Sequence, residues 1–365
     1  MEFTMKKLKR AACLLLATVF VCLSVGCKKD ETTTAATTTA APTTEATTTT
    51  EATTEATTEA TTTTEATTEA TTTTEATTES SADETYAEGY PVELTDIYGT
   101  KTVIKAKPQR IVSLSPACTE LVYYLGQESA LVGRTSACNY PLNVSAIESI
   151  GDIMQPDVEK IVSLNPDIVL TDSTMTPEAT VNQLRELGLT VVILNEGTTF
   201  DGVYSKIESA GKIFNADTKA AEIIDSMKGN LEEVQEKISD ARLHPSVYYV
   251  VGFGEGGDWT ATGDTFINDI ITMAGGDNIA KDGQSYSYNA EDLVKQDPNI
   301  IILPSWADGT FQTTAPYSEL TAVKTGNVIV LESTDTLDRQ GPRNVEAVEM
   351  LAKAFYPERF GEKAA

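Results

Sequence analysis

The chain has 365 residues, enough for two domains once its unusual N-terminal stretches are set aside. It carries 54 acidic against 27 basic residues, and this formal charge of −27 argues against nucleic-acid binding, which calls for a basic surface. The single histidine, His244, precedes a proline, which argues against a histidine-based catalytic centre or a carrier of bare zinc or manganese.

Residues 1–27 predict an export signal. A basic segment precedes the apolar run AACLLLATVFVCLSV, which is too short for a comfortable transmembrane helix. The run ends in small residues before Cys27, similar to a bacterial lipobox, although Leu23 lies one position too early. We favour cleavage before Cys27 and lipidation of its thiol. A plain cleaved signal or an uncleaved anchor is the alternative.

Residues 28–89 are dominated by Thr, Ala and Glu in units such as TTEA. The stretch has no apolar face to bury, so we expect it to be disordered. A lipid followed by a long solvated tether suits a protein held outside the cell membrane. Threonine-rich tracts can also carry O-linked glycans, which the sequence leaves open.

Residues 90–200 predict a first α/β lobe. A stretch that alternates apolar and polar residues around Tyr98 and Gly99 predicts a hairpin. Next, Arg110–Leu114 predicts a strand, with Ser115 as N-cap of the following helix. Further alternation of strands and helices predicts a parallel sheet.

One unit of this lobe recurs later in the chain. Residues 158–173, VEKIVSLNPDIVLTDS, align with residues 290–305, AEDLVKQDPNIIILPS. Each copy predicts a short helix opening with an exposed glutamate, Glu159 or Glu291, then a proline turn and a buried strand. The repetition predicts two lobes of like architecture.

Between the copies, residues 201–242 predict a helical segment broken near Asn215–Asp217. Its second half carries one apolar stripe, typical of a strut that packs on both lobes. Residues 243–365 then predict the second lobe, which ends in a helix from about Asn344 to Phe355. Loops at the carboxyl ends of parallel strands bind ligands in such folds, so we expect a cleft shared by both lobes.

The sequence offers little support for enzyme chemistry. Gly252–Gly257 satisfies the dinucleotide pattern GxGxxG, but no helix follows at once to meet a pyrophosphate. No nucleophile–base constellation is evident, so we predict neither an enzyme nor a bound cofactor. Cys118 and Cys138 could form a disulfide outside the cytoplasm or remain two buried thiols, and both are open.

Aromatic residues gather in the predicted cleft loops. They are Tyr140, Phe253, Trp259, Tyr286, Tyr288, Trp306 and Phe311. Some must belong to the core, but both tryptophans fall in polar, glycine-rich stretches, which favours flat walls for a bulky, partly apolar molecule. Asp335, Arg339 and Arg343 could add charged hydrogen bonds there, or form a solvated loop.

From about residue 90 onward, the chain resembles the substrate-binding proteins of ABC importers for cobalamin, iron–siderophores and haem. The resemblance rests on RIVSLSPACTELVYYLG, the loop ending NYP, the two repeat copies, TFINDIITMAGGDNI and RQGPR. It implies two Rossmann-like lobes with parallel sheets joined by one long rigid helix, the class III periplasmic-binding-protein fold. Residues 201–242 match that helix.

The resemblance also implies partners. Family members dock on a permease dimer through one acidic residue per lobe, and Glu159 and Glu291 occupy those positions. The positions near those that line the ligand cleft of the cobalamin member are Tyr140, Tyr286 or Tyr288, Asp335 and Arg339. Trp259 and Trp306 are added as ligand-binding candidates from the aromatic loops described above, and Met154 is added from the loop Gly151–Gln155. Met154 lies in the region where the cobalamin member has a tryptophan, so the resemblance does not decide which chelate is the ligand.

We therefore predict a monomeric, lipid-anchored receptor that delivers a metal chelate to an ABC importer without acting on it chemically. A corrinoid or ferric siderophore is favoured over haem. The alternative is a surface sensor or adhesion module that reuses the same fold.

Overall fold

The computed structural model describes residues 86–174 and 176–361. The predicted export signal, Cys27 and nearly all of the predicted tether lie outside the described residues. Within these ranges, no helix combines the length and the apolar character needed to cross a bilayer.

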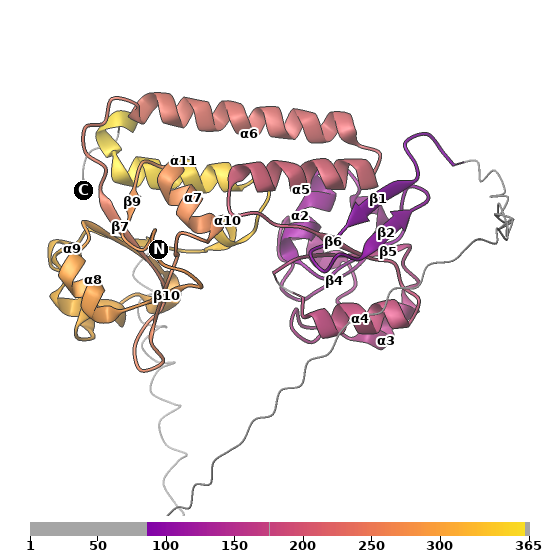
Figure 1. The fold of residues 1–365 in the computed structure, drawn as a ribbon, viewed down its shortest axis with the longest axis horizontal. Coiled ribbons are helices and arrows are strands. Elements are labelled where there is room, and N and C mark those ends of the chain that lie inside the picture. The colour runs from indigo at the N-terminus through magenta and orange to yellow at the C-terminus, as the bar shows by residue number, and fades with distance from the viewer. Residues whose placement is uncertain (1–85, 175, 362–365) are drawn as a thin grey trace, which may run out of the picture. The chain divides into compact units, whose positions relative to one another are not determined.

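The N-terminal lobe opens with an antiparallel hairpin and continues with a parallel sheet (Figure 1). The sheet order is β4-β3-β5-β6, as the alternation of strands and helices predicts. The strands are β1 (Val92–Thr95), β2 (Lys101–Ile104), β3 (Ile111–Ser113), β4 (Leu131–Arg134), β5 (Ile168–Asp172) and β6 (Val191–Leu194). The helices are α2 (Pro116–Tyr124), α3 (Val158–Ser163) and α4 (Glu178–Glu186), with short 3-10 turns at Glu128–Ala130 and Leu142–Ala146.

The C-terminal lobe has a mixed sheet in the order β10-β8-β7-β11-β12, with β9 beside β7. Strands β7, β11 and β12 are parallel, whereas β8 and β10 run antiparallel at one edge. The strands are β7 (Ser246–Gly252), β8 (Asp258–Thr260), β9 (Asp277–Asn278), β10 (Ser287–Tyr288), β11 (Ile300–Pro304) and β12 (Val328–Leu331). The helices are α7 (Phe266–Met273), α8 (Ala290–Gln296), α9 (Thr321–Thr325), α10 (Asp335–Asp338) and α11 (Asn344–Phe355). Short 3-10 turns occupy Ser305–Ala307, Phe311–Thr313, Tyr317–Glu319 and Pro357–Phe360.

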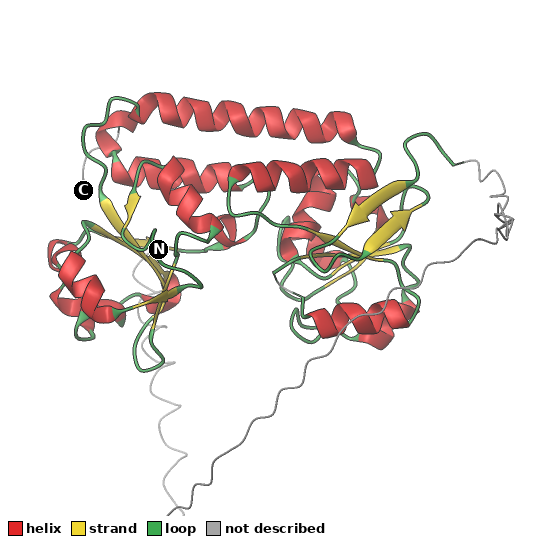
Figure 2. Ribbon diagram, in the orientation of Figure 1, coloured by secondary structure: helices red, strands yellow, loops and turns green. Residues whose placement is uncertain are grey.

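The segment 201–242 is two helices rather than one. Helix α5 (Phe200–Ile213) and helix α6 (Asp217–Ile238) lie side by side, and the break falls where the sequence predicts it (Figures 1 and 2). Asn215 reverses the chain with a positive φ of 49°. A Cβ on Gly211 would come within 2.7 Å of the Ala220 side chain, so glycine permits the close contact of the two helices. Helix α5 also reaches the C-terminal lobe at its start, where Phe200 packs on Phe266 of α7.

Helix α6 joins the lobes through a common core. Its buried stripe holds Ile223, Met227, Leu231, Val234 and Ile238, as the spacing predicts. The same apolar cluster includes residues of α5 in the N-terminal lobe and of α11 in the C-terminal lobe. Each sheet buries its opposite face in a separate core of its own lobe. Burial of one helix against both lobes makes the lobes a single packed unit.

The sequence repeat is also a structural repeat. Helix α3 is capped by Asp157, whose side chain accepts from the Lys160 amide, and α8 is capped by Asn289, which accepts from the Glu291 amide. Each unit then turns through a left-handed residue directly before its proline, Asn165 with φ 46° and Asp297 with φ 43°. The parallel strands β5 and β11 follow. Cap, turn and strand thus recur in register.

The GxGxxG match has a different explanation from nucleotide binding. Gly252–Gly257 joins β7 to β8, and these strands form an antiparallel pair. The loop therefore leads into a strand, and no helix N-terminus is available for a phosphate. The first helix after it, α7, begins at Phe266.

Candidate functional site

Two adjoining cavities lie where the lobes face each other. The first, here called the inter-lobe cavity, has a volume of about 260 Å³ and is lined by both lobes. The second, the C-terminal-lobe cavity, measures about 250 Å³. Asp338 lines both, so the two cavities share one wall residue.

Strand ends place the lining residues. On the N-terminal side, Ser115, Asp172 and Glu196 follow or end β3, β5 and β6. On the other side, Trp306 and Thr334 follow β11 and β12. The carboxyl ends of parallel strands meet at one edge of a sheet, so both lobes present their loops to the same cleft.

A buried ion pair supports the N-terminal wall. The Lys206 ammonium, wholly buried on α5, lies 2.8 Å from a Glu196 carboxylate oxygen, and the other oxygen accepts from the Thr174 hydroxyl at 2.5 Å. Burial alone would lower the pKa of Lys206, but the carboxylates of Glu196 and Asp172 and the nearby Cys118 raise it. Lys206 therefore stays charged and holds Glu196 in place.

Ser115 occupies the N-cap position of α2 but does not cap the helix with its side chain. Its hydroxyl instead donates to the Asp172 carboxylate, and both residues are buried. The sequence predicted that Ser115 stands at the N-cap position. It did not predict Asp172 as the hydrogen-bond partner, because Asp172 lies on a strand far away in the chain.

Arginines of the C-terminal lobe reach across the cleft. Arg339 and Arg343 lie 2.9 and 3.1 Å from the same oxygen of Glu120 on α2. Burial raises the pKa of Glu120, although the two guanidinium groups oppose that shift. Gln340 adds a reciprocal pair of hydrogen bonds to the backbone of Gly197. These contacts tie the two cleft walls together.

Four carboxylates, Asp172, Glu196, Asp335 and Asp338, line the inter-lobe cavity beside apolar residues. Arg339 is the one basic residue among its lining side chains, and it is already paired with Asp335 at 2.8 Å as well as with Glu120. Asp338 is reachable by solvent, yet the surrounding protein and the neighbouring Asp335 raise its pKa. The charged groups of the cavity are thus mostly acidic, and its one arginine is already paired.

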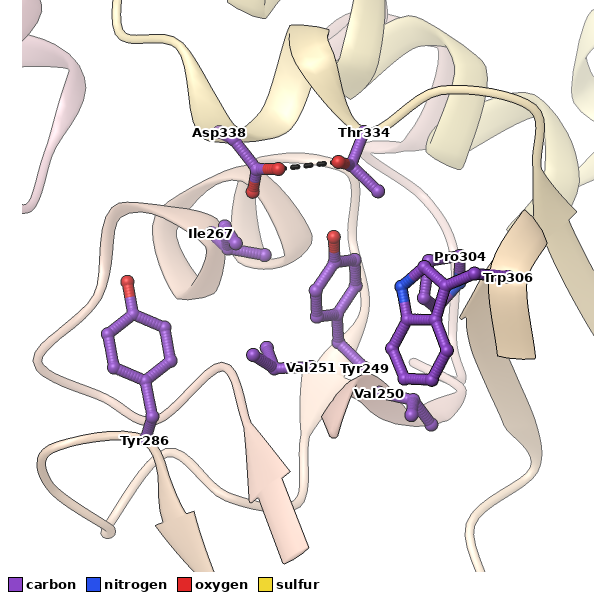
Figure 3. Close-up of a pocket in the computed structure, with 9 residues that line it drawn as sticks. All are labelled: Tyr249, Val250, Val251, Ile267, Tyr286, Pro304, Trp306, Thr334 and Asp338. Atoms are coloured by element: carbon purple, nitrogen blue, oxygen red, sulfur yellow. Dashed lines mark hydrogen bonds between the residues drawn. The ribbon is translucent and has the colours of Figure 1, made fainter. Parts of the chain in front are cut away.

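Three aromatic residues line the C-terminal-lobe cavity together with apolar and polar side chains. Tyr249, Tyr286 and Trp306 surround it together with Val251 and Ile267 (Figure 3). These are its aromatic and apolar walls; Asp338 and Thr334, linked by a 2.5 Å hydrogen bond, close one side. The arrangement suits a flat, partly apolar molecule with polar groups at its edge.

Trp306 is well placed for such contacts. It is 61% exposed and stacks on Phe253, with ring centroids 5.9 Å apart and planes inclined by 10°. Phe253 in turn packs on Phe311 and Tyr317 in the core of the lobe. Phe253 therefore supports one face of the indole, and much of the rest of the ring is exposed for contact with a ligand.

Other predicted ligand residues lie elsewhere. Trp259 is in the middle of strand β8, so its assignment to a loop was wrong, and it lines neither cavity. Tyr288 on β10 packs its ring on Tyr248 at 5.5 Å, and its hydroxyl bonds Gln296 at 2.6 Å. The ring of Tyr288 therefore belongs to the core side of the edge strand.

Tyr140 and Met154 are exposed at the rim of the N-terminal lobe and line neither cavity. Arg343 lies over the Tyr140 ring, 4.1 Å from its centroid, which connects this tyrosine to the contacts across the cleft. Ile153, next to Met154, does line the inter-lobe cavity.

The two cysteines of the described region are free and buried. Cys138 contacts the hydroxyls of Thr119 and Thr135 rather than Cys118. Burial raises the pKa of Cys118 well above its ordinary value. Within residues 86–174 and 176–361, no group of three or more His, Cys, Asp or Glu side chains could hold a metal ion.

Sequence reasoning missed Asp338, Asp172, Glu196 and Tyr249. For Asp338 a signal existed, because Asp335 and Asp338 are three residues apart and share one face of a short helix. Tyr249 gave no such signal, since it lies inside a buried apolar strand.

Glu159 and Glu291 are exposed in the first turns of α3 and α8. Neither has an ion-pair partner among the described residues. Figure 1 shows both helices on the side of their lobes away from α6. The repeat therefore presents two similar acidic helix starts on the same side.

Comparison with known proteins agrees with this architecture. The family described as Periplasmic binding protein matches residues 111–334. An uncharacterized ABC transporter substrate-binding lipoprotein of Bacillus subtilis is 34% identical over 280 residues, covering 75% of this chain and 88% of that protein. A cobalamin-binding protein of Halobacterium salinarum is 32% identical over 289 residues, covering 75% and 77%.

Solved structures share the fold. The periplasmic vitamin B12 binding protein of Vibrio cholerae superposes with a TM-score of 0.59 at 23% identity, covering 68% of this chain and 97% of that one. A periplasmic heme binding protein from Pseudomonas aeruginosa gives 0.63 at 25% identity, covering 68% and 93%. Two lobes joined through one long helix, a cleft between them and a family match over most of the described region lead to one conclusion: the chain belongs to the periplasmic binding protein family of ABC transporters.

Proposed function

We propose that the chain is a lipid-anchored, extracytoplasmic receptor that binds a metal chelate in the cleft and delivers it to an ABC importer. The observation that carries this proposal is the pair of cavities at the facing strand ends of a chain related to substrate-binding proteins. A corrinoid or a ferric siderophore is favoured over haem. The chelate is cargo, and the chain does no chemistry on it.

The size of the site supports a bulky ligand. Drug-sized and cofactor-sized ligands occupy pockets of roughly 300–1,000 Å³, more than either cavity provides alone. Because Asp338 lines both cavities, one ligand that fills them together would touch the aromatic wall and the acidic side chains. Trp306, Tyr286, Asp335 and Arg339 are the predicted residues that would contact it.

Glu159 and Glu291 would dock the two lobes on the two subunits of a permease dimer. Their exposure, their equivalent places in the repeat and their lack of ion-pair partners in the described region support this role. Paired, separated charges fix the orientation of a complex more than its affinity. The comparisons do not favour the alternative of a surface sensor or adhesion module.

The test is the double variant Glu159→Ala/Glu291→Ala. Uptake of a bound chelate by cells carrying the importer should fall at least about tenfold, because two interfacial charges are lost. Calorimetric affinity for the chelate should not change. Glu232→Ala/Glu233→Ala on α6 removes the same charge from the opposite side and should transport normally. Normal uptake by the first variant would contradict the docking role.

A further inference from the structure

Tyr249 presents an unusual hydroxyl to the C-terminal-lobe cavity. The residue is only 2% exposed, and its hydroxyl has no hydrogen-bond partner among the described residues, although that oxygen is open to the solvent of the cavity. Figure 3 shows the hydroxyl pointing toward the side of the cavity that Asp338 and Thr334 close. Buried tyrosine hydroxyls normally find a partner, so the occupant of the cavity is the natural source of one.

Asp338 supplies the complementary group. One of its carboxylate oxygens accepts from Thr334, and the other has no hydrogen bond to a described residue (Figure 3). The side chain lines both cavities. A free donor and a free acceptor therefore lie on the same stretch of wall.

This pair matches one chemical group in particular. A carboxamide has an oxygen that can accept from the Tyr249 hydroxyl and an NH₂ group that can donate to Asp338. A carboxylate can only accept, so it would meet the Asp338 oxygen as acceptor against acceptor and charge against like charge.

No nearby cation would offset that repulsion. Arg339, the basic residue that lines the inter-lobe cavity, is paired with Glu120 and Asp335. Lys206, behind the N-terminal wall, is paired with Glu196. Among the described residues that line the cavities, none is a basic side chain without a carboxylate partner.

We propose that Tyr249 and Asp338 together bind a carboxamide side chain of the chelate, and so select uncharged, amide-bearing chelates against carboxylate-bearing ones. This inference rests on the proposed function and narrows its ligand. Corrinoids carry primary carboxamides and ferrioxamine siderophores carry secondary amides, each with the required oxygen and N–H, whereas haem carries carboxylates instead.

The test compares two probes with the same ring and different periphery. Dicyanocobinamide carries carboxamides, and dicyanocobyrinic acid carries carboxylates in their place. Calorimetric titration of the purified full chain should show at least about tenfold tighter binding of dicyanocobinamide. Tyr249→Phe should weaken that binding by about fivefold through loss of one hydrogen bond. Asp338→Asn should bring the carboxylate probe within about threefold of the amide probe.

Tyr204→Phe is the matched control, because this half-buried tyrosine lies on α5 outside both cavities, and its affinities should equal those of the wild type. A ferrioxamine that binds in place of dicyanocobinamide, with the same dependence on Tyr249, would support the inference and assign a hydroxamate source.

Three results would overturn the inference while chelate binding itself stands. They are equal affinity for the two corrinoids, an unchanged preference for the amide probe over the carboxylate probe in the variants, and tighter binding of haem than of the other probes. Absence of binding by dicyanocobinamide, ferrioxamine and haem alike would overturn the proposed function and this inference with it.

Discussion

Among the described residues that line the cavities, the N-terminal lobe meets the cleft with buried charges and no aromatic ring, whereas the C-terminal lobe meets it with aromatic rings in addition to charged groups such as Asp338. Glu196 on the first side is held by Lys206 and Thr174, and Trp306 on the second side is held by Phe253. The residues of both walls follow the carboxyl ends of parallel strands. Equivalent places in the two lobes therefore carry different side chains. The repeated helix–turn–strand unit presents the acidic helix starts, and residues outside that repeat form much of the ligand cleft.

Removal of the buried Lys206 ammonium should show how much its ion pair with Glu196 contributes to the stability of the fold. Lys206→Met leaves Glu196 buried without its partner, so we expect the free energy of unfolding to fall by about 3 kcal/mol. Denaturant titration measures the loss. The double variant Lys206→Met/Glu196→Gln removes both charges and should recover much of it. A single variant as stable as the wild type would show that the pair contributes nothing.

The aromatic wall should respond in binding rather than in stability. Trp306→Ala removes an exposed, stacked indole, and we expect about tenfold weaker chelate binding, or about 1.4 kcal/mol, in a calorimetric titration. Trp259→Ala is the control, because Trp259 lines neither cavity. An equal loss in both variants would contradict the assignment of Trp306 to the ligand wall.

The contact between the lobes should give the smallest effect and a pH dependence. Burial raises the pKa of Glu120 in the folded chain above its ordinary value of 4.5, against the opposing effect of Arg339 and Arg343. The folded state thus binds this proton more tightly than the unfolded state. The contribution of protonated Glu120 to the free energy of unfolding is fully present below about pH 4.5. It is lost as the pH rises through the pKa of Glu120 in the folded state.

The comparison with Glu120→Gln isolates that effect. The stability of the wild type relative to the variant should decline by less than about 1 kcal/mol between about pH 4 and about pH 7. Urea unfolding across this range measures it. A difference that grows with pH would mean that the arginines outweigh burial and lower the pKa of Glu120 instead.

Local signals in the sequence predicted most of the secondary structure. The helix expected from about Asn344 to Phe355 has those bounds, and the break near Asn215 separates α5 from α6. Helix caps, glycines that end helices and the spacing of apolar residues act over a few residues. They can therefore be recognised in the sequence without knowledge of the fold. The second copy of the repeat, residues 290–305, was predictable for the same reason.

The cleft was predictable only in part. Asp335, Arg339, Tyr286 and Trp306 line the cavities, whereas Trp259 and Tyr288 do not. The sheet at this edge decides where the latter two lie, because β8 and β10 pair antiparallel in a register that no local pattern specifies.

Local signals in the chain were enough to place the helices and strands, the repeat and the two acidic helix starts, because short-range chemistry controls caps, turns and apolar periodicity. Which side chains share a cavity wall followed only from how the elements pack together. Asp172 meets Ser115, Lys206 meets Glu196, and the Tyr249 hydroxyl faces the same cavity as Asp338. Such contacts depend on the packing of elements far apart in the chain, and packing is a property of the whole core.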